Sequence, residues 1–479
     1  MIIGPLAPAV KRFCQDGLGK ADGLGVRAGL ALPILLHGLL LAVKRHSLAV
    51  LGEATLLHCR CAGTVCRWLA RLRFPVDRWH EHACRRLLAT AARLGGAGPF
   101  FALFDGTDSK RGGLAKIQNT RNYGKKPKTK KGGRPSSQSH TFLMGLLLLP
   151  CGLRLPLPRK SWYTKAYAKE QGLSYRTQIE LVEELLLWLA PLLPEDIDLV
   201  VLADSYFESK RLFDLCRQHD WTFITKLTKD RTFADEPGQR IVAQGESLAA
   251  EKFRRCRLCR GREATAGYRR QPPRKARAHE RRVYDYHSER RLVSKAGEVQ
   301  VVYSWKTPTY TPRANFERRH FAALVTNNLS LTPRKVVEYY ELRWQIEVFF
   351  RELKGQLGLQ DYQGTHFPSY ERYVTLVLLG YMVLEHQRLR GLAGRSGPDE
   401  PRGGWTTART AALLQQVRRE AQQADLRWIE QRLKTRSGRR LLRQTLRQGQ
   451  CREAPGGRAA PGGPAGGGSH KGKKARRAA

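Results

Sequence analysis

Apolar residues recur along this chain with two different periods, and the change of period divides it into regions. Through residues 1–97 they recur every three to four positions, the spacing of amphipathic helices, and Pro75 separates two of these helices. Such a pair is typical both of a helix-turn-helix DNA reader and of an ordinary helical pair. Residues 30–43 are almost wholly apolar, but a bilayer span needs ~20 apolar residues, so this stretch predicts a buried helix.

From residue 98 the pattern is that of strands separated by helices. One apolar run ends at Asp105, and a second, over residues 199–203, ends at Asp204. A helix and another strand, which ends at Leu227, follow the second run. We expect each aspartate to lie at the carboxyl end of a strand, and strands that alternate with helices predict an α/β core.

The segments between these runs differ in character. Residues 110–134 hold ten Lys or Arg and no acid among Gly and Pro, so they predict a loop. Residues 140–158 predict a hairpin that turns at 150–152, and residues 175–193 predict a helix. Short strand-like runs among dense arginines fill residues 228–318.

Toward the end the pattern becomes helical again. Thr332 and Pro333 are typical of the cap and the first position of a helix. Further helices are predicted over 370–392 and 405–450, whereas the Gly/Pro/Ala-rich residues 452–479 predict a disordered tail.

The charge narrows the class of partner. The 479 residues include 85 Lys and Arg against 42 Asp and Glu, a formal net charge of +43. A protein this basic is expected to bind a polyanion, nucleic acid before membrane. The ten cysteines include one C-x-x-C pair, Cys256 and Cys259, but no second ligand pair at the spacing of a zinc site, so we expect reduced thiols and a cytoplasmic, nucleoid-associated protein.

One predicted helix, residues 340–357, carries the candidate chemistry. At about 100° per residue, one side of it faces the core with Leu342, Ile346, Phe349, Phe350, Leu353 and Leu357. The adjacent stripe is polar and consists of Tyr340, Arg343, Glu347, Arg351 and Lys354. A carboxylate beside a buried face is costly unless it reaches water, pairs with a base or holds a cation. On a solvated helix face, the ion pairs Arg343–Glu347 and Glu347–Arg351 would supply the base.

The order of residues in this helix is more specific than its periodicity. Tyr340 is followed after two residues by Arg343, after three more by Glu347 and after six more by Lys354, within the string YYELRWQIEVFFRELKGQLGL. The helix resembles the one that carries the Y-R-E-K signature in DDE transposases of bacterial insertion sequences. The similarity runs from about residue 100 to 363.

This resemblance implies an RNase H-like core in which two further acids meet the glutamate. Asp105 and Asp204 lie in the right order for them; Asp108 is a rival for the first, but Asp105 directly ends its apolar run. Asp105, Asp204 and Glu347 would be the catalytic residues and would hold two Mg²⁺ ions, with Mn²⁺ as a substitute, about 3.5–4 Å apart. Without a cation, three converging carboxylates would raise one another's pKa.

The resemblance also assigns roles to the neighbouring residues. DNA phosphate near the transposon end would be gripped by Tyr340, Arg343 and Lys354. Arg351 shares their stripe and is a further candidate for DNA binding. Some relatives capture a flipped base on an aromatic residue of an inserted segment, for which Trp305 and Phe321 are candidates here.

The implied fold class is α/β, with an RNase H-like mixed-sheet core that is interrupted by a β-rich insertion and flanked by basic helical regions. In chain order we expect a helical DNA-binding region (1–97), the first part of the core (98–227), the insertion (228–320), the rest of the core with the glutamate helix (321–365), a basic helical region (366–451) and a disordered basic tail (452–479).

The implied function is cut-and-paste transposition of DNA. The protein would bind terminal inverted repeats, hydrolyse phosphodiester bonds at the element ends and join the freed 3′ ends to target DNA. The partners would be double-stranded DNA and a second copy of the chain, with no membrane. Three alternatives remain: an RNase H-like nuclease or host-adopted transposase without strand transfer, an inactive DNA-binding remnant, and an RNA-packaging protein, which explains the charge but not the spaced acids.

Overall fold

A computed structural model of the chain describes residues 6–18, 26–43, 46–53, 62–70, 76–93, 98–111, 117–123, 137–228, 230–259, 281–307, 321–393 and 407–450. The predicted disordered tail and most of the predicted basic loop therefore lie outside the described residues.

One mixed sheet forms the centre of the molecule. Its strands are β1 (Phe100–Arg111), β2 (Arg121–Tyr123), β3 (Ser137–Leu148), β4 (Arg154–Pro156), β5 (Lys160–Ser161), β6 (Leu199–Ala203), β7 (Thr222–Lys226), β8 (Arg254–Cys259), β9 (Arg281–Val293), β10 (Gly297–Thr307) and β11 (Phe321–Thr326). Their order is β2-β3-β1-β6-β7-β11-β10-β9-β8, and β4 and β5 also pair with β3. The predicted hairpin is confirmed, because β3 and β4 pair as antiparallel strands.

Only the central strands of the described sheet run in parallel. β1 pairs in parallel with β6, and β6 with β7, whereas β3 lies between β2 and β1 and is antiparallel to both. This order is compatible with an RNase H-like fold. The strands of the segment predicted to be β-rich, β8 to β10, do not form a separate sheet: they extend the same one beyond β11.

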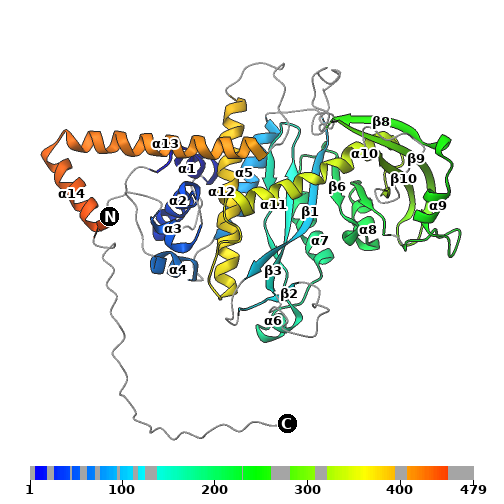
Figure 1. Cartoon of the computed structure of the whole chain (residues 1–479), viewed down its shortest axis with the longest axis horizontal. Coiled ribbons are helices and arrows are strands. Elements are labelled where there is room, and N and C mark those ends of the chain that lie inside the picture. The colour runs from blue at the N-terminus through cyan, green and yellow to red at the C-terminus, as the bar shows by residue number, and fades with distance from the viewer. Residues whose placement is uncertain are drawn as a thin grey trace, which may run out of the picture.

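Helices lie on both faces of the sheet and beyond its β1–β3 side (Figure 1). The helices that precede the sheet are α1 (Pro8–Arg12), α2 (Val26–Leu41), α3 (Leu48–Glu53), α4 (Ala62–Ala70) and α5 (Val76–Arg93). Those within and after it are α6 (Lys165–Glu170), α7 (Gln178–Leu189), α8 (Lys210–Gln218), α9 (Ile241–Ser247), α10 (Pro333–Leu342), α11 (Trp344–Gln356), α12 (Phe367–Ala393), α13 (Thr407–Leu433) and α14 (Arg436–Gln450).

Local signals explain where two of these helices begin. The Thr332 hydroxyl accepts a hydrogen bond from the N–H of Lys335, and Pro333 is the first residue of α10, as the sequence predicts. Thr177 and Glu180 form a capping box, so α7 begins at Gln178 and not at the predicted residue 175.

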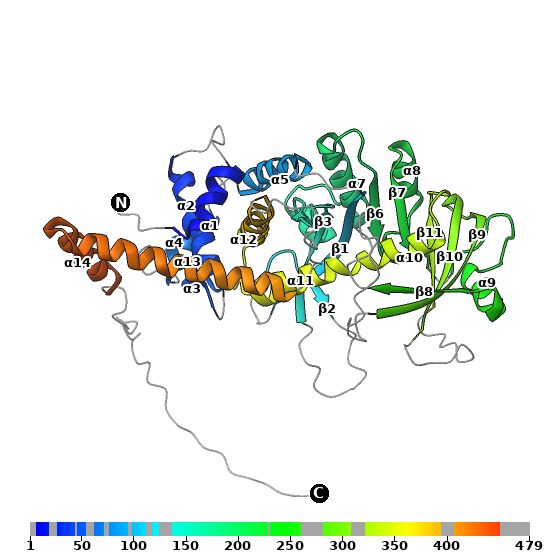
Figure 2. The ribbon, with the colours of Figure 1, turned by 90° about the horizontal axis from the view of Figure 1, so that it is seen from above.

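The sheet separates two helical layers. Figure 2 shows α7 and α8 on one face and the line formed by α10 and α11 on the other. α10 packs across β6, β7 and β11, and α11 packs on β1. The ring of Phe101 in β1 also meets that of Tyr339 in α10 edge to face, with centroids 4.9 Å apart. The helix pair is therefore fixed against the parallel strands.

The terminal helices pack around α12. This helix contacts α2, α4 and α5, and α13 contacts α1, α2, α11 and α12 before it extends away from the sheet toward α14 (Figure 1). α2 contains the buried helix predicted for residues 30–43, with Leu36, Leu39 and Leu40 fully enclosed. None of the helices in the described ranges combines the length and hydropathy that a membrane span requires.

Candidate active site

Two aspartates lie beyond the point where β1 and β6 stop pairing. The last parallel pair between these strands is Leu103 with Leu202, so Asp105 and Asp204 each follow it by two residues. Because the two strands are in register, their side chains at equivalent positions project from the same face of the sheet. The prediction that Asp204 follows the end of its strand is confirmed, since β6 ends at Ala203.

The prediction that β1 ends at Asp105 is wrong. β1 loses its parallel neighbour but stays paired with β3 as far as Arg111, opposite Gln138. Beyond Asp105, the polar residues Thr107, Ser109 and Arg111 are buried: Ser109 accepts a hydrogen bond from Tyr370, and Arg111 donates to backbone carbonyls of the segment before α12. The start of the predicted basic loop is thus strand, and β2 forms a further part of it.

The glutamate helix is not a single regular helix. α10 ends at Leu342 and α11 begins at Trp344. Arg343 keeps helical dihedral angles, but its N–H bonds to the carbonyl of Tyr340, three residues back, and its carbonyl accepts from Ile346, three residues on. This tightened turn breaks the regular hydrogen-bonding of the helix but does not change which side faces the core. The predicted apolar stripe from Leu342 to Leu357 is therefore buried as expected.

The tightened turn places Arg343 between two of the acids. Its Nη2 lies 2.8 Å from Oε1 of Glu347, and its Nη1 lies 4.0 Å from Oδ2 of Asp105. The guanidinium is 16% exposed, against 28% for the Asp105 side chain and 31% for that of Glu347. Glu347 is therefore compensated by a base in this structure. The other ion pair of the solvated-face alternative, with Arg351, does not form: Arg351 is exposed.

Asp105 is the acid whose protonation the site changes most clearly. Burial raises the pKa of Asp105 to about 6, and Asp204 and Glu347 act in the same direction. Arg343 and the N–H of Gly106, 2.7 Å from Oδ1, act against them. The three predicted acids thus lie within electrostatic reach of one another, and the positive charge present does not neutralise them fully.

Asp105→Asn is expected to stabilise the metal-free protein above pH 6. In the unfolded chain the pKa of Asp105 is near 3.8, so the folded state binds the proton of this carboxyl more tightly. The free energy of unfolding therefore falls as the pH rises from about 4 to about 6. Asparagine removes this penalty, for a gain of roughly 1–3 kcal/mol at pH 7.5. Urea unfolding in EDTA at several pH values measures it; a gain that does not grow between pH 4 and 6 contradicts the assignment.

The remaining residues of the polar stripe differ in their surroundings. Tyr340 is half-buried beside Arg343, whose guanidinium lies 5.9 Å from its ring centroid, and burial raises the pKa of its phenol, which stays protonated. Burial also lowers the pKa of Lys354, which Asp108 and Asp105 oppose. Tyr340, Arg343 and Lys354 therefore line the acids, whereas Arg351 points to solvent.

The rival acid Asp108 is already engaged. Arg121 donates to both of its carboxylate oxygens at 2.8 Å, and the Thr141 hydroxyl donates to Oδ1 at 2.6 Å. Its parity along β1 also differs from that of Asp105, so the two project to opposite faces of the strand. Of the two aromatic candidates for base capture, Trp305 is 6% exposed in β10, and the side chain of Phe321 lies outside the described part.

The donor set suits a divalent cation in kind, since carboxylate oxygens are the ligands that Mg²⁺ prefers. As arranged, however, the described residues contain no group of three His, Cys, Asp or Glu side chains close enough to hold a metal ion. The guanidinium of Arg343 bridges Asp105 and Glu347 instead. The spacing of the helix indicated the pair of Arg343 with Glu347 as an alternative, but it gives no signal for the contact of Arg343 with Asp105.

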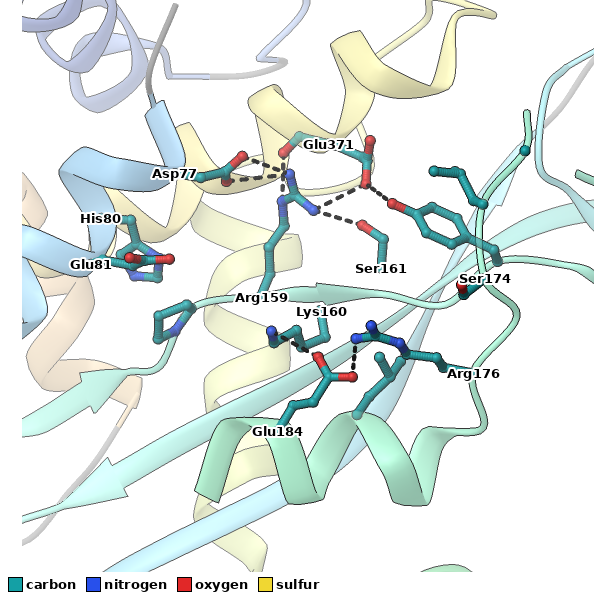
Figure 3. A pocket seen from close by; sticks show the side chains of 15 residues that line it. Asp77, His80, Glu81, Arg159, Lys160, Ser161, Ser174, Arg176, Glu184 and Glu371 are labelled. Atoms are coloured by element: carbon teal, nitrogen blue, oxygen red, sulfur yellow. Dashed lines mark hydrogen bonds and ion pairs between the residues drawn. The ribbon is translucent and has the colours of Figure 1, made fainter. Parts of the chain in front are cut away.

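A separate hollow of about 650 Å³ lies between α5, β5, α7 and α12 (Figure 3). Several of its charges pair within it: Glu184 pairs with Lys160 and Arg176, and Arg159 pairs with Asp77 and Glu371. It does not include any of the predicted site residues.

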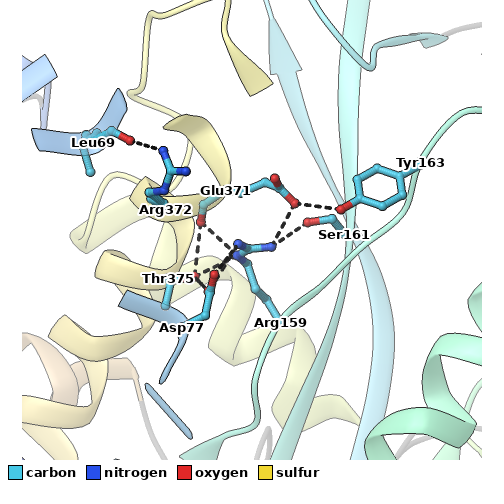
Figure 4. A network of polar contacts seen from close by, with 8 residues as sticks. All are labelled: Leu69, Asp77, Arg159, Ser161, Tyr163, Glu371, Arg372 and Thr375. Carbon is cyan, nitrogen blue, oxygen red and sulfur yellow. Dashed lines mark hydrogen bonds and ion pairs between the residues drawn. The ribbon is translucent and has the colours of Figure 1, made fainter. Parts of the chain in front are cut away.

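Arg159 connects three elements at the wall of this hollow. Its side chain is 8% exposed and donates to the Ser161 hydroxyl at 2.6 Å, the Thr375 hydroxyl at 2.8 Å and the Glu371 carboxylate at 3.2 Å (Figure 4). It also pairs with Asp77 at 3.3 Å, so one guanidinium ties α5, β5 and α12 together. None of the three predicted acids lines this hollow, so we do not place the reaction there.

Comparison with known families gives a match that covers the second aspartate and the α10–α11 pair. Residues 175–383, somewhat less than half of the chain, match the family described as Transposase DDE domain. The match includes Asp204, Glu347 and the lining residues Tyr340, Arg343 and Lys354, whereas Asp105 lies outside it. It supports a transposase of the DDE family, a class of enzymes whose partner is DNA. A comparison with curated proteins finds no match.

Proposed function

We propose that this protein catalyses cut-and-paste transposition of an insertion sequence, as a DDE transposase of the Y-R-E-K group. The observation that carries the proposal is the register of β1 and β6, which sets Asp105 and Asp204 at equivalent positions while Arg343 links Asp105 to Glu347. Three acids from two strands and a helix thus surround one cationic group. The family match supports transposase chemistry in general, and the Y-R-E-K spacing supports this group.

Asp105, Asp204 and Glu347 would hold two divalent ions, Mg²⁺ or Mn²⁺. When bound, such ions activate the attacking oxygen and stabilise the leaving oxygen of a phosphodiester. For the carboxylates to converge on a cation, the guanidinium of Arg343 has to leave Glu347. It then becomes available to a DNA phosphate, together with Lys354 and the protonated phenol of Tyr340.

The chain's charge supports double-stranded DNA as the partner, with terminal inverted repeats and target DNA as substrates. Phosphate contacts by Lys and Arg release counterions, so binding should weaken steeply as salt rises. α14 contains five Arg and no acid, and Arg436, Arg439, Arg440 and Arg443 are exposed on it. By resemblance, we propose that two copies of the chain act together on the two ends of the element.

Cleavage of a plasmid that carries the element's inverted repeats tests the proposal. With Mg²⁺ we expect cuts at the repeat ends and joining of the freed 3′ ends to a second plasmid. With EDTA, or with scrambled repeats, we expect neither cutting nor joining. Cuts without joining would establish the nuclease or host-adopted alternative. Repeat-specific binding without cleavage under Mg²⁺ or Mn²⁺ would overturn the enzyme and leave a DNA-binding remnant.

A further inference from the structure

A closed cluster of charges is buried behind the glutamate helix. It consists of two acids and two bases from three elements: Glu352 of α11, Glu385 and Arg388 of α12, and Arg154 of β4. The side chains are 0%, 2%, 7% and 4% exposed, respectively. Burying a charge is costly unless a partner and hydrogen bonds compensate for it, so the cluster depends on every one of its contacts.

The contacts of Glu352 come from three different elements. Its Oε2 accepts a hydrogen bond from the Tyr381 hydroxyl at 3.0 Å and lies 3.2 Å from Nη1 of Arg154. Its Oε1 accepts one from the Thr410 hydroxyl at 2.9 Å. Tyr381 belongs to α12 and Thr410 to α13, so one carboxylate of α11 is held by both helices and by β4.

Thr410 completes the cluster from outside. Its hydroxyl donates to Glu352 and accepts from Nη2 of Arg154 at 2.9 Å, so its single proton and one lone pair are both used. Thr410 is 2% exposed and lies in the first turn of α13, the helix that then extends away from the body (Figure 1). The beginning of α13 is therefore fastened to α11 through one buried hydroxyl.

Glu352 lies five residues beyond Glu347 on α11, a rise of about 7.5 Å along the helix. Between them the apolar stripe packs the helix against the core, with Phe349 edge to face on Tyr381, and directional polar contacts restrict its rotation and axial shift further. The Glu352 contacts are directional, whereas Glu347 itself is 31% exposed and, among the residues that the structure describes, is held only by Arg343, which has to release it when a cation binds. The orientation of the free carboxylate then depends on the helix.

We propose that Glu352 is a positioning residue for Glu347, and that Thr410 is the group through which α13 holds the glutamate helix in place. The proposal rests on the proposed function in that it takes Glu347 to be a ligand of the catalytic cation. It assigns to α13 a part in the active site that is separate from any contact it makes with DNA.

Three variants of the full-length protein test this proposal. Thr410→Val keeps the shape and removes the hydroxyl, Thr410→Ser keeps the hydroxyl, and Glu420→Gln breaks a different contact of α13, the 3.0 Å ion pair with Arg12 of α1. The first readout is amide hydrogen exchange of α11 without DNA or metal. We expect Thr410→Val to speed it roughly tenfold or more, because a charged group loses its hydrogen bond, while the other two variants match the wild type.

The second readout is the single-turnover cleavage rate at saturating DNA, with DNA affinity measured alongside. Thr410→Val should lower the rate by roughly 10–100-fold, because a small misplacement of a catalytic group has effects of that size, and should leave affinity within about twofold. Thr410→Ser should restore the wild-type rate.

The outcomes separate the two proposals. Unchanged exchange of α11 in Thr410→Val, or equal deprotection in Glu420→Gln, overturns the positioning role even where cleavage is found. If the wild-type protein does not cleave, the proposed function fails, and the exchange data still decide whether Thr410 holds α11.

Discussion

Glu347→Gln is expected to abolish cleavage while leaving DNA binding intact. The amide cannot supply the negative charge that a divalent ion needs, and bound ions contribute several kcal/mol to the stabilisation of charge in the transition state. We therefore expect the single-turnover rate on an end-labelled repeat duplex to fall roughly 10³-fold or more, since each 1.36 kcal/mol is a factor of ten. Raising Mg²⁺ should recover little of it.

Glu338→Gln is the matched control for this experiment. Glu338 also forms a pair four residues apart with an arginine, Arg334 at 2.8 Å, but on α10, nine residues before Glu347. The Glu338→Gln variant should cleave the repeat duplex at close to the wild-type rate. Both variants should bind the repeat duplex with wild-type affinity, because neither removes a cation. Cleavage by Glu347→Gln within about tenfold of the wild type would show that this carboxylate is not a ligand of the catalytic ion.

Among the variants proposed for this protein, Glu385→Gln is expected to lower the free energy of unfolding most. Nε and Nη2 of Arg388 donate to its Oε2 at 3.0 and 2.6 Å, and the backbone N–H of Arg154 does so at 3.0 Å. The neutral amide leaves two buried guanidinium groups facing one remaining carboxylate. Breaking a buried pair in this way costs about 3–5 kcal/mol, which urea unfolding at pH 7.5 would measure.

The pH dependence of Glu385 follows from the same contacts. Burial alone would raise the pKa of Glu385, but Arg388 and Arg154 outweigh it and hold the pKa below its usual range. Its contribution to stability is thus present above the pKa of the unfolded chain, about 4.3, and is lost as the pH falls further. The gap between wild type and Glu385→Gln should therefore narrow on acidification.

The partly exposed ion pair between Glu420 and Arg12 provides a control for stability as well. Its side chains are 25% and 31% exposed, so Glu420→Gln should cost below about 1 kcal/mol. An equal loss in the two variants would show that burial does not strengthen the cluster around Glu385.

Much of this arrangement could be predicted from the sequence because it depends on local periodicity. The strand that ends before Asp204, the cap at Thr332 and the buried stripe of α11 each follow from spacing over a few residues. β1 continues past Asp105 for a different reason: polar residues there are buried by Tyr370 and other groups more than 200 residues away. No local pattern predicts such burial.

Local spacing also could not predict the contact of Arg343 with Asp105 or the burial of Glu352, because both depend on residues far away in the sequence. Glu352 belongs to neither the apolar nor the polar stripe of the predicted helix, and its partners come from β4, α12 and α13. Arg343 was expected to contact DNA. That it bridges two acids depends on the register of β1 with β6 and on the tightened turn between α10 and α11.

The alternation along β1 has a consequence for how this chain can change over evolutionary time. Asp105 faces the side of α11, whereas a Cβ on the next residue, Gly106, would lie 2.8 Å from Oε1 of Gln178 in α7, on the opposite face. Deleting or inserting one residue between Phe100 and Asp105 would exchange these faces and turn the carboxylate away from Glu347. Relatives of this chain are therefore expected to vary the side chains of this segment while keeping its length.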